Sequence, residues 1–188
     1  MARLINLGMV SLDGFINDAS GSFDWAVPDE ELHRYINRLE ASIGTCLYGR
    51  RMYEVMSYWA DPPADSHEVE QEYAAHWQDA DKIVHSTTLE SVSTPRTTLV
   101  PAFDPAAIAA LKASAERDIS ISGPTLAAAA YRAGLVDEVG LFVNPVVVGG
   151  GTPFLPSGVR LDLELVGEHR FPSGVVHLQY AVLPAGDQ

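Results

Sequence analysis

Short apolar runs alternate with helix-like patterns along the chain up to residue 145. The first run, residues 4–10, is apolar except at Asn6 and Gly8, and the turn-forming pair Asp13 and Gly14 follows it. Strands without polar alternation are buried on both faces, and parallel strands need crossover helices to join them. The alternation therefore predicts an α/β fold, in which helices cover both faces of a mostly parallel sheet.

Hydrophobic periodicity assigns the other elements in the same way. Further strands are expected at residues 45–48, 82–85, 97–100, 119–121 and 136–148, and an antiparallel hairpin at residues 161–171 and 175–183. Helices are expected at residues 28–42, 52–59 and 66–77, from the Asp104–Pro105 pair onward, and between the turn 122–125 and Gly134. No repeat or linker interrupts the pattern, so residues 1–188 are expected to form a single domain.

Charge and cysteine content exclude several classes of protein. The chain carries 12 Lys plus Arg against 25 Asp plus Glu and no basic run, so nucleic acid is not an expected partner. Cys46 is the only cysteine, which rules out a disulfide within the chain. No apolar stretch reaches the roughly 20 residues that cross a bilayer, and no cleavable signal precedes the first strand, so we expect a cytoplasmic protein with no membrane partner.

Ligands of open α/β sheets bind where the carboxyl ends of the strands meet helix N-termini. The strand exits of this chain offer glycines for close backbone approach, arginines for phosphate, and hydroxyls. Each group also has an ordinary structural interpretation, as a solvated arginine pair, a plain turn or a proline-capped helix. The residues concerned are Gly49, Arg50, Arg51, Ser86, Thr87, Thr88, Ser122, Gly123, Pro124 and Thr125.

Carboxylates and metal ligands give weaker signals. Asp13 lies at the first exit, and the acids of residues 29–31 suit a ligand site or merely complement a helix dipole. The histidines lack short paired spacing and Cys46 has no partner thiol, so no metal site is expected. The triple glycine at residues 149–151 suits either a ligand contact or a bend.

Several motifs taken together resemble a known family. They occupy residues 9–14, 47–54, 122–123, 134–138, 144–153 and 171–176, in order over essentially the whole chain. In this combination the chain is similar to the family that joins dihydrofolate reductases to the reductase C-terminal domain of the riboflavin pathway. The resemblance implies a three-layer αβα dihydrofolate-reductase-like fold with an antiparallel C-terminal hairpin.

The resemblance also implies a cofactor, NADPH or alternatively NADH, lying across the strand ends. Its phosphates would lie over residues 49–52, its adenosine half near residues 86–88, and its pyrophosphate along residues 122–126, while Met9 and Val10 would face the nicotinamide. The carried-over residues include Met52 and Leu126. The chain departs from the family's pattern at Met52, Thr87 and Pro124, which weakens the preference for NADPH, although Arg50 or Arg51 offers compensating charge.

The implied reaction is hydride transfer to a C=N or C=O carbon of a small substrate resembling a pterin or a pyrimidine. By the same resemblance, Glu30 is the first choice of proton donor and Glu31 the second, and burial beside Trp25 would raise the proton affinity of Glu30. Asp13, Trp25 and Asn144 are expected to line the substrate pocket, although each also suits a turn, strand or packing role.

The sequence is also compatible with other functions. A riboflavin-pathway pyrimidine reductase would need a second cationic cluster for its phosphorylated substrate, and few basic residues remain for it. The same fold could also serve a non-catalytic NADPH-binding or sensor protein, a hydrolase or a structural dimer. The apolar terminal hairpin and residues 136–148 carry more hydrophobic surface than one sheet face usually hides, which favours a homodimer.

Overall fold

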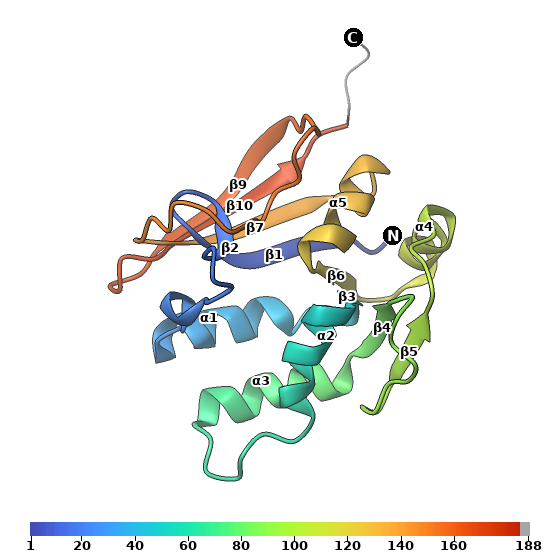
Figure 1. Cartoon of the computed structure of the whole chain (residues 1–188), viewed down its shortest axis with the longest axis horizontal. Helices are drawn as coiled ribbons and strands as arrows, with labels where there is room; N and C mark the ends of the chain where they lie inside the picture. Colours follow the sequence, from blue (N-terminus) through green and yellow to red (C-terminus); the bar gives the residue numbers. More distant parts are fainter. Residues whose placement is uncertain (185–188) are drawn as a thin grey trace.

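The computed structural model describes residues 1–184, so the last four residues of the predicted domain lie outside the description. One eight-stranded sheet dominates these residues (Figure 1), in the order β5-β4-β3-β6-β1-β7-β10-β9. Its strands are β1 (Leu4–Ser11), β3 (Ile43–Gly49), β4 (Asp81–His85), β5 (Thr97–Val100), β6 (Asp118–Ser122), β7 (Glu138–Asn144), β9 (Leu163–Arg170) and β10 (Val176–Val182). A small second sheet pairs β2 (Phe15–Asn17) with β8 (Thr152–Pro153).

The pairing of β1 organises the large sheet. This strand pairs in parallel with both β6 and β7, and β3, β4 and β5 continue the parallel arrangement. Strands β10 and β9 return antiparallel beyond β7. The mostly parallel sheet with an antiparallel C-terminal hairpin, predicted from the strand and helix pattern, is therefore confirmed.

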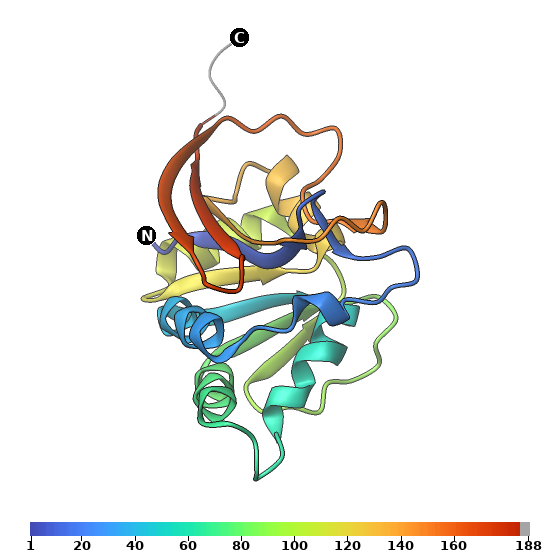
Figure 2. The ribbon, with the colours of Figure 1, turned by 90° about the vertical axis from the view of Figure 1, so that its left-hand side faces the viewer.

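Helices cover the two faces of this sheet (Figure 2). On one face lie α1 (Glu30–Glu40), α2 (Arg50–Met56) and α3 (Glu68–Asp79), and on the other lie α4 (Pro105–Ser114) and α5 (Pro124–Arg132). Alternation along β3 separates the two layers: Cys46 packs toward α2 and α3, whereas Leu47 packs toward α4 and α5. None of the helices in residues 1–184 is long and apolar enough to cross a membrane.

Several predicted boundaries are wrong for identifiable reasons. The first helix begins after Asp29 and not at Pro28, because the Asp29 carboxylate accepts a hydrogen bond from Leu32 N at 2.9 Å. The strand expected over residues 136–148 ends at Asn144, where the following Pro145 has no N–H for the ladder. The third helix is preceded by His67 and not Ser66. The short strands β2 and β8 and the 3₁₀ turn η1 (Asp24–Ala26) were not predicted.

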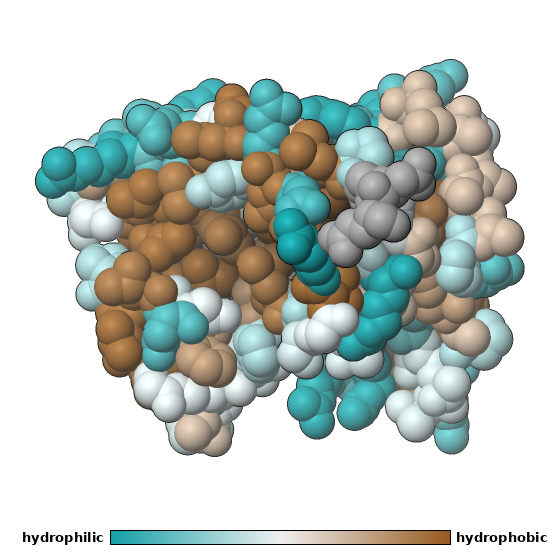
Figure 3. Space-filling model, turned by 90° about the horizontal axis from the view of Figure 1, so that it is seen from above, coloured by the Kyte–Doolittle hydropathy of each residue, from teal (hydrophilic) through white to brown (hydrophobic). Residues whose placement is uncertain are grey.

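One part of the sheet carries no helix within the described chain. The face of β7, β10 and β9 opposite α1 is crossed by the extended segment between β8 and β9 (Figure 2), and Ile16 of β2 packs against part of it. A broad hydrophobic area is visible at this end of the molecule (Figure 3). We call this surface the sheet-face patch, and its members are Leu141, Val143, Leu163, Leu165, Tyr180 and Val182.

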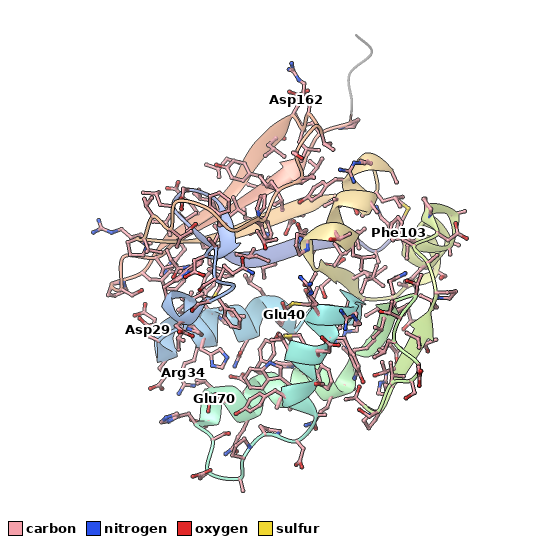
Figure 4. The ribbon with its side chains drawn as sticks, viewed as in Figure 1. Asp29, Arg34, Glu40, Glu70, Phe103 and Asp162 are labelled. Atoms are coloured by element: carbon pink, nitrogen blue, oxygen red, sulfur yellow. The ribbon has the colours of Figure 1, made fainter. Side chains whose placement is uncertain are left out.

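The larger of the two described cavities, about 50 Å³, lies under the C-terminal end of α1. It is lined by residues from the amino ends of β1 and β7, such as Arg3 and Glu138, and by Glu40 and His177. Glu40 lies at the end of α1 that is remote from Asp29 (Figure 4). Burial raises the pKa of Glu40 to about 7.

Replacement of Glu40 by Gln should flatten the pH dependence of stability. The folded pKa of about 7 lies above the ordinary value of 4.5, so the stability that this group contributes is present below pH 4.5 and is lost as the pH rises through 7. Because Glu40 is not fully shielded from solvent, the effect is smaller than the full pKa shift implies. We expect the free energy of unfolding of Glu40→Gln, relative to that of wild type, to rise by roughly 1–2 kcal/mol from pH 5 to pH 8. Urea denaturation at pH 5 and at pH 8 measures the free energy of unfolding, and Glu31→Gln, which changes an exposed acid of the same helix, is the control. Parallel curves for wild type and Glu40→Gln would contradict the assignment.

Candidate functional site

The parallel register brings the exits of β3 and β6 together at one edge of the sheet. Tyr48 pairs with Ser122, so Gly49 and Gly123 follow side by side. Gly123 has φ +103°, and a Cβ added there would lie 3.6 Å from Gly49 N. At Gly49 itself nothing lies within 4 Å of an added Cβ. Two segments predicted to hold phosphates are thus adjacent, and their backbone faces open space at Gly49.

Cationic and backbone donors surround these glycines. Arg50 pairs with Glu54 at 3.3 Å, and both side chains are nearly half exposed, so an anionic ligand displaces this pair at little cost. Arg51 is exposed beside it. At the start of α5, Pro124 has no N–H, which leaves the amides of Thr125 and Leu126 as the first-turn donors. The Leu126 side chain is buried in the core, so only its backbone is available to a ligand.

The next exit carries the three predicted hydroxyls, and the structure gives them different environments. His85 pairs with Gly49, which places residues 86–88 one strand away from the glycines. Ser86 Oγ accepts hydrogen bonds from Thr88 N at 3.1 Å and Leu89 N at 2.9 Å, so this hydroxyl shapes the turn. Thr87 and Thr88 are exposed and available to a ligand.

Tyr53 fastens the loop that follows these hydroxyls. Its hydroxyl accepts hydrogen bonds from Ser93 N at 3.0 Å and Thr94 N at 3.3 Å, and lies 3.1 Å from Thr94 Oγ1. Burial acts to raise the pKa of Tyr53, but the hydrogen bonds from Thr94 and Ser93 outweigh it, and the pKa lies below its usual value. Sequence reasoning did not select Tyr53, although it lies within the family-like motif at residues 47–54.

At the exits of β1 and β7, the expected substrate residues hold the backbone. Asp13 accepts hydrogen bonds from Val148 N at 3.1 Å and Gly149 N at 2.8 Å. A hydrogen bond from Ser11 and these backbone donors keep the pKa of Asp13 below its usual value. Asn144 is buried, and its Nδ2 donates to the carbonyls of Val10 and Phe142, each at 3.1 Å. Asp13 therefore positions the loop after β7, whereas Asn144 links the carboxyl ends of β1 and β7.

Met9 and Val10 point to opposite faces of β1. Met9 packs on the side of α1, where a nicotinamide is expected. Val10 is 2% exposed and packs with Val139 and Phe154 on the other face, because alternation along a strand allows only one of two consecutive side chains on each face. The expected contact of Val10 with a nicotinamide would therefore involve its backbone and not its side chain.

The expected burial of Glu30 beside Trp25 is also wrong. The Glu30 side chain is 70% exposed and pairs with Arg34 at 2.7 Å, one turn along α1. Glu31 is exposed as well. Asp29 and Arg34 mark this first part of α1 (Figure 4). Trp25 lies in η1 and is partly buried, and its Nε1 is shielded from solvent without a hydrogen-bond partner.

The arrangement as a whole suits an anionic, extended ligand laid across the strand ends. It supplies backbone donors at α5, arginines at α2 and exposed hydroxyls after β4. Among residues 1–184, no three His, Cys, Asp or Glu side chains gather in a way that would hold a metal ion. The 50 Å³ cavity lies at the opposite edge of the sheet and is separate from these groups.

Removal of the Asp13 carboxylate should loosen the loop after β7. Asp13→Ala leaves the amides of Val148 and Gly149 without their acceptor, so their hydrogen exchange should accelerate about tenfold or more. The low pKa of Asp13 means that wild type keeps this protection at neutral pH and loses it only as the pH falls through that lowered value. Asp24→Ala, which removes an exposed acid in η1, is the matched control. Equal rates of hydrogen exchange at these two amides in both variants would contradict a role of Asp13 in holding the loop.

Comparison with known proteins identifies the family of this chain. Residues 4–177 match the RibD C-terminal domain family. A Bacillus subtilis (strain 168) protein described as the uncharacterized protein YyaP is 30% identical over 175 residues, which cover 91% of this chain and 90% of that protein.

Two solved structures share the fold. A putative riboflavin biosynthesis protein from Shewanella sp. PV-4 has a TM-score of 0.77 at 21% identity, with 98% of this chain and 100% of that chain covered. A diaminohydroxyphosphoribosylaminopyrimidine deaminase/5-amino-6-(5-phosphoribosylamino)uracil reductase from Thermotoga maritima has a TM-score of 0.65 at 13% identity, with 97% of this chain and 57% of that chain covered. The expected resemblance is confirmed: this chain belongs to the RibD C-terminal domain family and has its dihydrofolate-reductase-like fold.

Proposed function

We propose that this chain is an NAD(P)H-dependent reductase that transfers a hydride to a small heterocyclic substrate resembling a pyrimidine or a pterin. The observation that carries the proposal is the adjacency of Gly49 and Gly123 at the carboxyl edge of the sheet, with open space at Gly49. A phosphate chain needs such close access to backbone N–H groups at a helix N-terminus. Membership of a reductase domain family supports the same conclusion.

The residues of the chain would bind and orient the cofactor. The amides of Thr125 and Leu126 would hold the pyrophosphate, and Arg50 and Arg51 would neutralise phosphate charge. Thr87 and Thr88 would meet the adenosine half, on a loop that Tyr53 holds in place. When bound, the cofactor supplies the hydride, and the protein supplies orientation.

The nicotinamide and the substrate would meet on the α1 side of β1. Met9 would contact the nicotinamide from the sheet, and η1 with Trp25 would cover the substrate. Because Glu30 and Glu31 are exposed, we propose that solvent water, and not a buried carboxylic acid, supplies the proton near the start of α1. Reduction of 5-amino-6-(5-phosphoribosylamino)uracil is the reaction in the name of the Thermotoga maritima neighbour, and it is the chemistry that we propose to test first.

Replacement of Arg50 by Gln should selectively weaken the binding of NADPH. Loss of a charge-assisted hydrogen bond to a phosphate costs about 1.5–3 kcal/mol, so the dissociation constant for NADPH should rise about tenfold or more. NADH, which lacks the 2′-phosphate, should respond less. Titration of cofactor fluorescence measures both constants, with Arg132→Gln at the far end of α5 as the control. Failure of wild type to bind either dinucleotide would refute the proposed function, and binding without turnover across a substrate panel would favour a sensor.

We also propose that the protein is a homodimer that buries the sheet-face patch. Leu165 is 49% exposed on the edge strand β9, next to the exposed Leu163. An edge strand presents unpaired backbone groups, and an exposed apolar face of this kind is usually covered in solution. A second copy of this chain would cover the sheet-face patch of each subunit at once, because a two-fold interface uses the same surface on both subunits.

Leu165→Glu should convert this dimer into a monomer. The new carboxylate would be buried against its own symmetry mate, which opposes association. Light scattering after size exclusion gives the mass, and far-UV circular dichroism checks the fold. Val27→Glu, which changes an exposed apolar residue away from the patch, should leave the mass of the dimer unchanged. A monomeric wild type would refute the proposed dimer.

A further inference from the structure

We infer that the substrate is a planar, unphosphorylated heterocycle that carries a C=N or C=O group and is neutral or cationic. This inference rests on the proposed reductase function and adds the chemical class of the substrate. It concerns the surface where η1 and the exits of β1 and β7 meet, on the side of the sheet end away from Arg50 and Arg51.

The segments that form this surface contain no lysine and no arginine. Neither residues 4–33 nor residues 133–159 include a Lys or an Arg. The first segment instead carries several acids around η1 and the start of α1, which are Asp13, Asp18, Asp24, Asp29, Glu30 and Glu31. A phosphate monoester brings nearly two negative charges, so it would meet carboxylates here and no compensating cation.

Two cations on neighbouring elements, Arg34 and Arg170, offer no free charge to this surface, because Arg34 already faces two carboxylates and Arg170 points elsewhere. Arg34 is held by Glu30 at 2.7 Å and by Glu68 at 3.5 Å. Arg170 lies two strands beyond β7, at the end of β9. Its neighbour His169 stacks on Tyr35 of α1, so alternation turns the Arg170 side chain toward the opposite face of the sheet.

Exposed apolar side chains, and not cations, lie at this end of the sheet. Leu12 is 65% exposed, Phe23 51%, Val27 76% and Val147 65%, and we call these four residues the apolar rim. Leu12 N donates to Val146 O at 2.7 Å, which ties the two strand exits together, and η1 packs against β1. An apolar aromatic compound would cover such side chains and remove their surface from water.

Trp25 gives a further sign of a ligand with a polar edge. Its Nε1 is shielded from solvent and has no hydrogen-bond partner in the described structure. A buried N–H without an acceptor is costly, and indole nitrogens usually find one. A heterocycle that displaces the protein atoms covering this nitrogen would supply that acceptor through its carbonyl or ring nitrogen. A flat ring with a polar edge therefore matches both the apolar rim and Trp25.

A matched pair of compounds tests the inference directly. The probes are 5-amino-6-(5-phosphoribosylamino)uracil and the same compound after removal of its phosphate, each titrated by calorimetry into protein saturated with NADP⁺. We expect the dephosphorylated compound to bind at least tenfold more tightly. Tighter binding of the phosphorylated compound, or no binding of the dephosphorylated one, overturns the inference. Because cofactor binding is measured separately, that result is distinguishable from failure of the proposed function.

A charge added to the apolar rim tests the location. In Val147→Lys, the phosphorylated compound should bind about tenfold more tightly than it binds wild type, while the dephosphorylated compound should change less than twofold. Leu183→Lys adds the same charge at the opposite edge of the sheet and should change neither constant. Equal responses of the two compounds to Val147→Lys would show that the rim does not face the substrate and would overturn the inference.

Discussion

The parallel pairing of β1 with β6 and β7 is the constraint on which the rest of the structure depends. Parallel strands end at the same edge of a sheet, so this pairing gathers segments that lie more than a hundred residues apart. Ser11 pairs with Asn144, and across β6 the same edge continues to Gly49. Every ligand-binding group that we propose follows from this one arrangement of the backbone.

That edge has two halves with different chemistry. Around Gly49 and Gly123 the backbone is open and arginines are close, which suits phosphates. Around η1 the side chains are acidic or apolar, which suits an uncharged ring. In the proposed function, this division would separate the cofactor from the substrate, and it would let a chain with a net charge of −13 hold an anionic dinucleotide.

Some residues that looked chemical in the sequence proved to be structural. Asp13 accepts hydrogen bonds from the loop after β7, Asn144 donates to backbone carbonyls of β1 and β7, and Ser86 caps its own turn. Glu30 pairs with Arg34 in solvent. Sequence patterns identify the residue type and its approximate element, but the partner of a polar side chain depends on which other loop folds against it.

Hydrophobic period and turn chemistry are local properties, so they sufficed to predict the α/β class, the order of the main strands and helices, the terminal hairpin and the strand exits with glycine. Three features became clear only from the folded chain: Val10 packs on the face away from α1, Tyr53 holds the loop after β4, and part of the sheet carries no helix among the described residues. Those features depend on contacts between distant segments, and no local pattern encodes which face of a strand a later element will cover.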